Sequence, residues 1–335
     1  MPLPKLNAPF DRVPTTGLRG QFGPYLATES LVHAANTALG LGLPLLLTGE
    51  PGSGKSDFAW VVAHALGLEA PLRCQVRSGT TAKELLYHFD ALVRFADAQH
   101  GDRERSREPR HYVTLQPLGL ALMSKARQVV LIDEIDKAPR DLPNDLLWEL
   151  DEGSFEISEV SDVDESTQIF DDKLPGVPLQ RRMQRPGGAE RPLLVITSNS
   201  ERQLPDAFLR RCVFFHIPSP SDSDLVKIAR ERFPNEPLKL VTSLVEIFAA
   251  LRRVERLTKP PSTSELLNWL EAMTRIYDRD EVQMAVDAFE SALKRGKGAL
   301  SIKGYQHWSA LPGLQCLIKL REDLDSLTPP KPRGA

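Results

Sequence analysis

The chain has 335 residues, of which 41% are hydrophobic and 26% charged, as is ordinary for a globular protein large enough for two domains. The formal net charge of −3 gives no overall attraction to nucleic acid or to an anionic membrane. Three cysteines without C-x-x-C spacing argue against a zinc site and against a disulfide framework. The sequence begins without an apolar signal core, and its longest apolar stretch, 39–47, is broken by glycine and proline. We therefore expect a cytoplasmic protein without a membrane segment.

Patterns of helix and strand alternate over the first two thirds of the chain. Residues 1–24 are rich in proline and glycine and predict an irregular N-terminal arm. After them, short apolar runs predict strands at 43–48, 72–77, 128–132, 192–197 and 213–217. Apolar residues at helical spacing predict helices at 28–39, 55–66, 82–99, 118–126, 143–150 and 206–211. This alternation is typical of an α/β fold whose parallel sheet carries helices on both faces.

Beyond 218–220 the pattern changes to helices only. They are expected at 222–233, 238–257, 264–276, 281–293 and 316–327. We therefore predict an α/β core over 25–220, followed by a small all-helical domain and C-terminal extension over 221–335.

The segment Gly49-Glu50-Pro51-Gly52-Ser53-Gly54-Lys55-Ser56 matches the pattern G-x-x-x-x-G-K-[ST]. It lies between a predicted strand and a predicted helix, which is the context that a phosphate-binding loop requires. Glycines let backbone N–H groups approach phosphate oxygens, and the following helix directs its positive end toward the same anion. Lys55 would reach the β- and γ-phosphates, and Ser56 would place its hydroxyl on Mg²⁺. All eight residues are predicted to bind ATP, with Mg²⁺ as the second cofactor; the alternative is a chance match in a glycine turn.

A second motif is the apolar strand pattern 128–132, which ends in Asp133 and Glu134. Ligands of open parallel sheets collect at the carboxyl ends of the strands. Asp133 is expected to hold the magnesium, directly or through water, and Glu134 to activate or orient the attacking water. A solvated acidic turn is the alternative. Asp136 and Lys137, in the same turn, are interpreted as surface charges or a subunit contact.

Three sequence segments, in this order, give the chain its resemblance to AAA+ ATPases. They are LLLTGEPGSGKS, VVLIDEIDKAPRDLPNDLLWELDEGSFEI and LLVITSNSERQLPDAFLRRCVFFHIP. It resembles the MoxR family in particular, over about residues 17–275. The resemblance implies a P-loop NTPase core with a helical lid, and hydrolysis of ATP to ADP and phosphate. It also implies that Asn199 acts between the carboxylates and the γ-phosphate. The alternative for Asn199 is a residue that caps the turn after a strand.

The resemblance further implies that Arg211, with Arg210 as second candidate, is a finger inserted into the nucleotide site of a neighbouring subunit. The alternative is a pair of surface arginines at a helix C-terminus. Because a finger cannot reach its own site, a homo-oligomer is expected, in this family a hexameric ring. Two insertions would face the pore of the ring: 82–117, which resembles the helix-2 insertion of the family, and 153–191, which resembles its hairpin before the strand that carries Asn199. A solvated flexible loop is the alternative for 153–191. Residues 259–267 lack the arginine that the family carries at the start of a lid helix; Lys259 or an arginine of 251–256 is the expected substitute.

By family resemblance, the favoured function is chaperone-like remodelling or maturation of a protein partner that carries a von Willebrand factor A domain. The alternative is a nucleic-acid motor or a restriction- or defence-type NTPase subunit. The arginines of 181–185 favour that alternative, whereas the overall charge does not indicate nucleic acid. A third possibility, a non-catalytic nucleotide switch, leaves Glu134 without a role.

Overall fold

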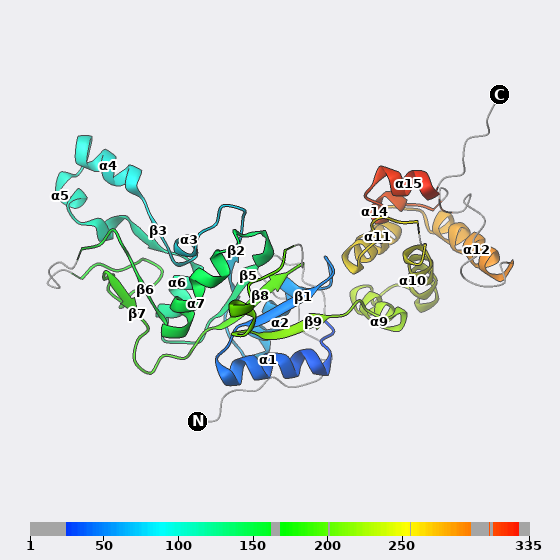
Figure 1. Ribbon diagram of the computed structural model, residues 1–335. Coiled ribbons are helices and arrows are strands. Elements are labelled where there is room, and N and C mark those ends of the chain that lie inside the picture. The colour runs from blue at the N-terminus through cyan, green and yellow to red at the C-terminus, as the bar shows by residue number, and fades with distance from the viewer. Residues whose placement is uncertain are drawn as a thin grey trace. The chain divides into compact units, whose positions relative to one another are not determined.

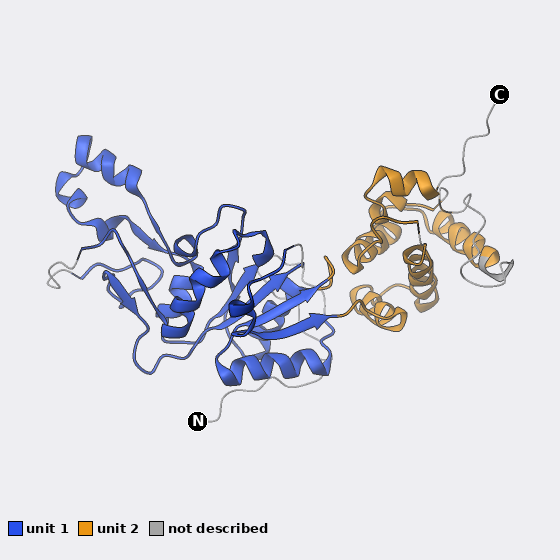
Figure 2. Ribbon diagram, in the orientation of Figure 1, with its two compact units in different colours: residues 1–49, 55–217 blue, residues 50–54, 218–335 orange. Residues whose placement is uncertain are grey.

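The computed structural model describes residues 25–161, 168–199, 202–254, 256–295, 308 and 311–327. The chain divides into two compact units, shown in blue and orange in Figure 2. Unit 1 comprises 1–49 and 55–217, and unit 2 comprises 50–54 and 218–335. The expected irregular arm, 1–24, lies outside the described residues.

A five-stranded parallel sheet forms the centre of unit 1 (Figure 1). Its strand order is β2-β5-β8-β1-β9. The strands are β1 (Leu45–Gly49), β2 (Leu72–Gln75), β5 (Val129–Asp133), β8 (Leu193–Ser198) and β9 (Val213–Ile217). Each lies within two residues of a predicted strand. The predicted fold class, an α/β P-loop core with a helical C-terminal region, is confirmed.

Helices cover both faces of the sheet, which explains why its inner strands are largely apolar and buried at every position. Leu45 and Leu47 of β1 point to one face and pack with α1 and α2, whereas Leu46 points to the other face. The helices of the first face are α1 (Glu29–Leu41) and α2 (Lys55–Ala65). Those of the second face are α3 (Ala82–Leu86), α6 (Pro117–Met123), α7 (Leu142–Glu152) and α8 (Asp206–Leu209).

The helix predicted over 82–99 is not continuous, because the chain leaves α3 after Leu86. Tyr87–Phe89 forms β3, which pairs antiparallel with β4 (Val113–Leu115). Asp90 then starts a new helix, α4 (Ala91–His100), by accepting a hydrogen bond from Val93 N. The expected loop 101–111 contains two short helices, α5 (Arg103–Ser106) and η1 (Pro109–Tyr112).

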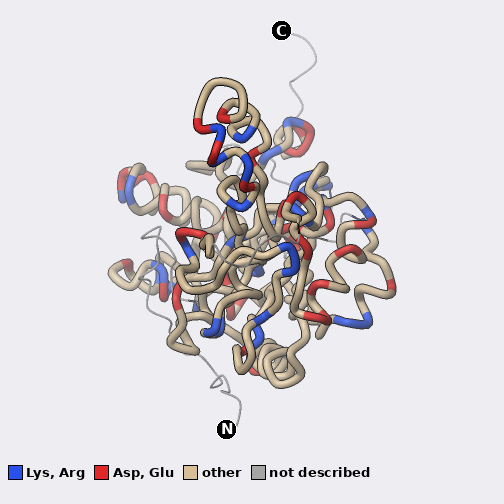
Figure 3. Tube along the Cα trace, turned by 90° about the vertical axis from the view of Figure 1, so that its left-hand side faces the viewer, with Lys and Arg blue, Asp and Glu red and all other residues tan. Residues whose placement is uncertain are grey.

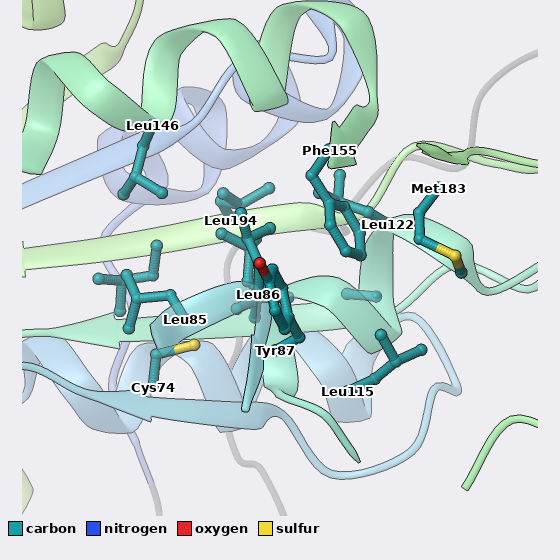
Figure 4. Packing of buried hydrophobic residues seen from close by; sticks show 14 of the residues in the cluster. Cys74, Leu85, Leu86, Tyr87, Leu115, Leu122, Leu146, Phe155, Met183 and Leu194 are labelled. Atoms are coloured by element: carbon teal, nitrogen blue, oxygen red, sulfur yellow. The ribbon is translucent and has the colours of Figure 1, made fainter. Parts of the chain in front are cut away.

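The polar segment 153–191 also contains structure that its sequence pattern did not predict. Residues Ser154–Glu156 (β6) and Arg182–Gln184 (β7) form a two-stranded antiparallel sheet. Figure 4 shows Phe155 of β6 and Met183 of β7 among the buried residues that cover the second face of the large sheet. The Phe155 ring stacks on Tyr87, with ring centroids 6.2 Å apart. This packing attaches the insertion to the core of unit 1.

Within 218–335, the described part of unit 2 has helices and connecting loops. Its helices are α9 (Asp222–Arg232), α10 (Leu238–Arg252), α11 (Thr263–Arg275), α12 (Arg279–Arg295), α14 (Leu314–Leu317) and α15 (Arg321–Leu327). Trp269 is fully buried in their shared core, and its Nε1 donates to Pro312 O at 2.8 Å. The single helix expected over 316–327 is two helices joined by an extended segment. No described helix has the length and apolar character needed to cross a bilayer.

Replacing Phe155 with alanine tests whether the β6–β7 hairpin depends on core packing. The side chain is 3% exposed, so its removal leaves a cavity, and we expect unit 1 to lose about 3 kcal/mol of stability. Urea unfolding followed by hydrogen exchange of unit 1 peptides measures the loss. Phe170→Ala is the matched control, because Phe170 is 39% exposed and its truncation should cost less than about 1 kcal/mol. Equal losses in the two variants would contradict the anchoring role of Phe155.

Candidate nucleotide site

The phosphate-loop residues around Lys55 have the conformation that an anion-binding loop needs. Gly52 and Gly54 have φ angles of 75° and 84°, a left-handed conformation that glycine adopts without strain. Lys55, the first residue of α2, is buried, and its Nζ donates to Gly49 O at 2.9 Å. Ser53 Oγ is buried and has no hydrogen-bond partner among the described residues. A phosphate oxygen would satisfy this hydroxyl and offset the charge of Lys55, so the loop fits a nucleotide phosphate.

Asp133, at the carboxyl end of β5, is held by three donors from three other elements. Its Oδ1 accepts from Ser56 Oγ at 2.6 Å and from Thr197 Oγ1 at 2.8 Å. Its Oδ2 accepts from Arg73 Nη2 at 2.7 Å. Burial disfavours the ionised carboxylate, but the hydrogen bonds from Ser56, Thr197 and Arg73 outweigh it and lower the pKa of Asp133. The side chain is therefore a carboxylate at neutral pH, next to the Ser56 hydroxyl, and these are ligands that Mg²⁺ accepts.

Arg73 is a site residue that the sequence analysis missed. It lies on β2, which pairs in parallel with β5, so both strands end at the same edge of the sheet. Its charge also acts on Asp57 of α2. Burial and the nearby Asp133 raise the pKa of Asp57, while Arg73 opposes that rise. The only signal in the sequence was a basic residue inside a predicted strand, and the sequence gives no strand order that would link Arg73 with Asp133.

Glu134 follows Asp133 in a left-handed backbone conformation, with φ 60° and ψ 50°. It is the only described non-glycine residue with positive φ, and such a conformation is uncommon for glutamate. Its backbone N donates to Thr197 Oγ1 at 2.9 Å, so one hydroxyl contacts both acids of the motif. Its carboxylate accepts from Lys137 Nζ at 2.7 Å and from Asn199 Nδ2 at 3.4 Å. The turn thus points the Glu134 side chain away from β5 and toward Asn199.

The interpretation of Asp136 as a surface charge is wrong, whereas the Lys137 side chain is 42% exposed. Asp136 is 2% exposed, and its Oδ2 accepts from the backbone N of Asn199 at 3.1 Å. Lys137 forms an ion pair with Glu134. Both residues therefore position the predicted catalytic groups. The sequence pattern did not separate them from an exposed acidic turn because it does not show that the turn packs against the end of β8.

Comparison with known proteins gives the family of this site. The model of the AAA domain (dynein-related subfamily) matches residues 44–212, which are 169 of the 335 residues and so just over half of the chain. The chain belongs to this AAA domain family. No curated protein matches it. The chain therefore carries an ATPase domain of the P-loop class, and Gly49–Ser56, Asp133, Glu134 and Asn199 all lie inside the matched range.

The two candidate finger residues follow helix α8 of the AAA domain and precede β9. Both are exposed. Arg211 is engaged within the subunit, since its Nε donates to Asp151 Oδ2 at 3.1 Å. The amino end of β9 is the edge of the sheet opposite to Asp133, because the strands are parallel. Neither arginine therefore belongs to the group formed by Ser56, Asp133, Glu134 and Asn199, and their action on a neighbouring subunit stays a prediction.

An arginine of unit 2 contacts a residue of the phosphate loop. Glu50 belongs to unit 2, and its Oε2 lies 3.1 Å from Arg252 Nη2. Arg252 is the last residue of α10 and lies in the range 251–256, where a substitute for the missing lid arginine is expected. No such contact with Glu50 is resolved for Lys259, whose backbone N donates to Asp323.

Replacing Arg73 with glutamine tests how much the Arg73 guanidinium stabilises the fold through the Asp133 carboxylate. We expect a loss of about 1 kcal/mol at pH 7, a modest value because the Arg73 side chain is 41% exposed and partly screened. Since the pKa of Asp133 is lowered in the folded state, this stabilisation is full above the unfolded pKa, about 4, and is lost as the pH falls through the folded pKa. Urea unfolding of wild type and variant from pH 7 down to about pH 2 measures the difference, which should be largest near pH 7 and shrink below about pH 4.

Arg77→Gln is the control for that measurement. It removes the same charge two residues after β2, where the resolved hydrogen bonds of Arg77 involve only its backbone N and O. We expect its stability to follow wild type across the pH range. A difference between Arg73→Gln and wild type that widens as the pH falls would contradict the proposed hold on the carboxylate.

Proposed function

We propose that the chain is a MoxR-like AAA+ ATPase, a cytoplasmic ring oligomer that hydrolyses ATP to remodel or mature a protein partner. The observation that carries the catalytic part is the arrangement of the two acids. Asp133 contacts Ser56 of the phosphate loop, and Glu134 turns away toward Asn199. This arrangement supports a role for Asp133 with a metal at the phosphate loop and a role for Glu134 with a water molecule.

The residues divide the chemistry as follows. Lys55 and the backbone of the loop bind the phosphates, and Ser56 and Asp133 would hold Mg²⁺. When bound, the metal neutralises phosphate charge and so favours attack on the γ-phosphate. Glu134 orients or deprotonates the attacking water, while Lys137 and Asn199 hold its carboxylate. Asn199 is fixed in turn through its backbone N by the buried Asp136.

The oligomeric part of the proposal rests on the position of Arg210 and Arg211. They lie at the amino end of β9, whereas the acids lie at the carboxyl end of β5. A second copy would be needed to bring Arg210 or Arg211 to the phosphates, which supports a ring, with six copies as the expected number. A partner with a von Willebrand factor A domain is proposed from the MoxR resemblance.

Charge distribution favours a protein partner over nucleic acid. Figure 3 shows lysine and arginine interleaved with aspartate and glutamate along the described trace. A nucleic-acid motor would be expected to collect basic residues on one surface. The arginines of 181–185 do not act together as such a surface, because Arg185 lines a pocket while Arg181 and Arg182 are exposed.

Replacing Glu134 with glutamine tests the proposed reaction. The variant should bind ATP as wild type does, because Glu134 does not contact the phosphate loop, and its turnover should fall by about 100-fold or more through loss of the base. ATP binding is measured with a fluorescent nucleotide, and turnover by phosphate release. Lys55→Ala is the comparison that should lose binding as well.

The same Glu134→Gln variant tests the proposed partner. Loaded with ATP, it should stay assembled and retain the partner during affinity purification, whereas Lys55→Ala should not. Wild-type turnover in Glu134→Gln would remove this residue from the mechanism. Capture of DNA or RNA in place of a protein would favour the nucleic-acid alternative.

A further inference from the structure

A pocket in unit 1 lies at the end of the sheet opposite to the candidate nucleotide site. Its lining includes Pro44, Pro192 and Cys212, which immediately precede β1, β8 and β9. Gly49, by contrast, is at the carboxyl end of β1. The five residues of β1 span roughly 16 Å, so a phosphate bound at the chain's own loop does not reach this pocket.

Three arginines line this pocket, together with only one acidic residue, Asp151. Asp151 is already paired with Arg211. The guanidinium groups of Arg185 and Arg191 have no ion pair or hydrogen bond with any residue that the structure describes. Burial, and then the charge of Arg191, lower the pKa of Arg185, yet a guanidinium keeps its proton in proteins. The pocket therefore holds two cations without a resolved counter-ion.

Both arginines are held in position by the ends of helices. Gly42 and Gly153 are the left-handed C-caps of α1 and α7. A Cβ at Gly42 would lie 2.9 Å from Arg191 Cδ, and a Cβ at Gly153 would lie 3.2 Å from Arg185 Cζ. Each arginine thus lies directly against a helix C-terminus, whose partial negative charge favours a cation there. The helix ends position the guanidinium groups and leave their N–H donors available.

The chemistry of the pocket is that of a phosphate site. Two positioned guanidinium groups offer paired N–H donors that match phosphate oxygens. The rest of the lining includes apolar side chains, among them Leu122, Leu194 and Phe208. An apolar surrounding strengthens the attraction between the guanidinium groups and an anion.

We propose that Arg185 and Arg191 form a phosphate-binding pocket, which receives either the terminal phosphate of a nucleotide held by a second copy of this chain or free phosphate. The first source rests on the proposed function and gives the ring two further trans arginines beside Arg211. The geometry favours this first source, because the pocket contains Arg211 and lies at the opposite end of the sheet from the chain's own phosphate loop.

The pocket itself is tested by titration calorimetry with tripolyphosphate. The titrations use Lys55→Ala protein, so that binding at the phosphate loop is weakened equally in every sample. Adding Arg185→Gln and Arg191→Gln should weaken tripolyphosphate binding about 10-fold or more. Adding Arg181→Gln and Arg182→Gln, which removes equal charge from the same insertion outside the pocket, should leave it unchanged. Arg185→Lys with Arg191→Lys should restore part of the binding. Unchanged binding in the Arg185→Gln/Arg191→Gln protein would overturn the pocket.

The source of the phosphate is tested by mixing two full-length variants. Lys55→Ala has an impaired phosphate loop and keeps the pocket arginines. Arg185→Gln/Arg191→Gln keeps the phosphate loop and has an impaired pocket. If the pocket serves a neighbouring nucleotide, each variant alone has little turnover and the mixture regains a part. If the Arg185→Gln/Arg191→Gln substitutions abolish tripolyphosphate binding but the mixture of variants regains no turnover, the pocket is assigned to free phosphate. If wild type itself does not hydrolyse ATP, the proposed function fails, while the tripolyphosphate titration still decides whether the pocket exists.

Discussion

The hydroxyl of Thr197 is the link on which the candidate site depends. It donates to Asp133 and accepts from the backbone N of Glu134, so a single group on β8 fixes two consecutive residues of β5 and its turn. This contact requires β5 and β8 to be neighbours in parallel register, with Ile132 beside Ile196. The sheet therefore does more than bury apolar area, since its register sets which polar groups meet at the carboxyl edge.

The same link explains how two adjacent acids have different surroundings. Residues that follow each other in a strand point to opposite faces, and the left-handed turn at Glu134 adds a further change of direction. Asp133 stays among Ser56, Thr197 and Arg73, where the donors favour its charge. Glu134 instead meets Lys137 and Asn199. An uncommon backbone conformation at this residue costs free energy, and the contact with Thr197 helps to hold it.

The sequence was sufficient for the sheet, the two motifs and the helical C-terminal region, because each has a local pattern. It failed where tertiary contacts decide. Tyr87 continues a helical pattern, yet pairing with β4 and stacking on Phe155 make it part of a strand. Arg73 and Asp136 look like ordinary charged residues until strand order and burial are known. Their roles depend on neighbours distant in sequence, which neither spacing nor composition encodes.

The arginine pocket shows the same dependence at the other edge of the sheet. Arg185 comes from the insertion, Arg191 from the segment before β8, and Arg211 from the segment before β9. Core packing of Phe155 and Met183 places the first of these against the end of α7. A parallel sheet with acids at its carboxyl edge and arginines at its amino edge has complementary chemistry at its two ends. In the proposed ring, a second copy would bring these two ends together, which would connect the packing of one insertion to the assembly that hydrolysis would require.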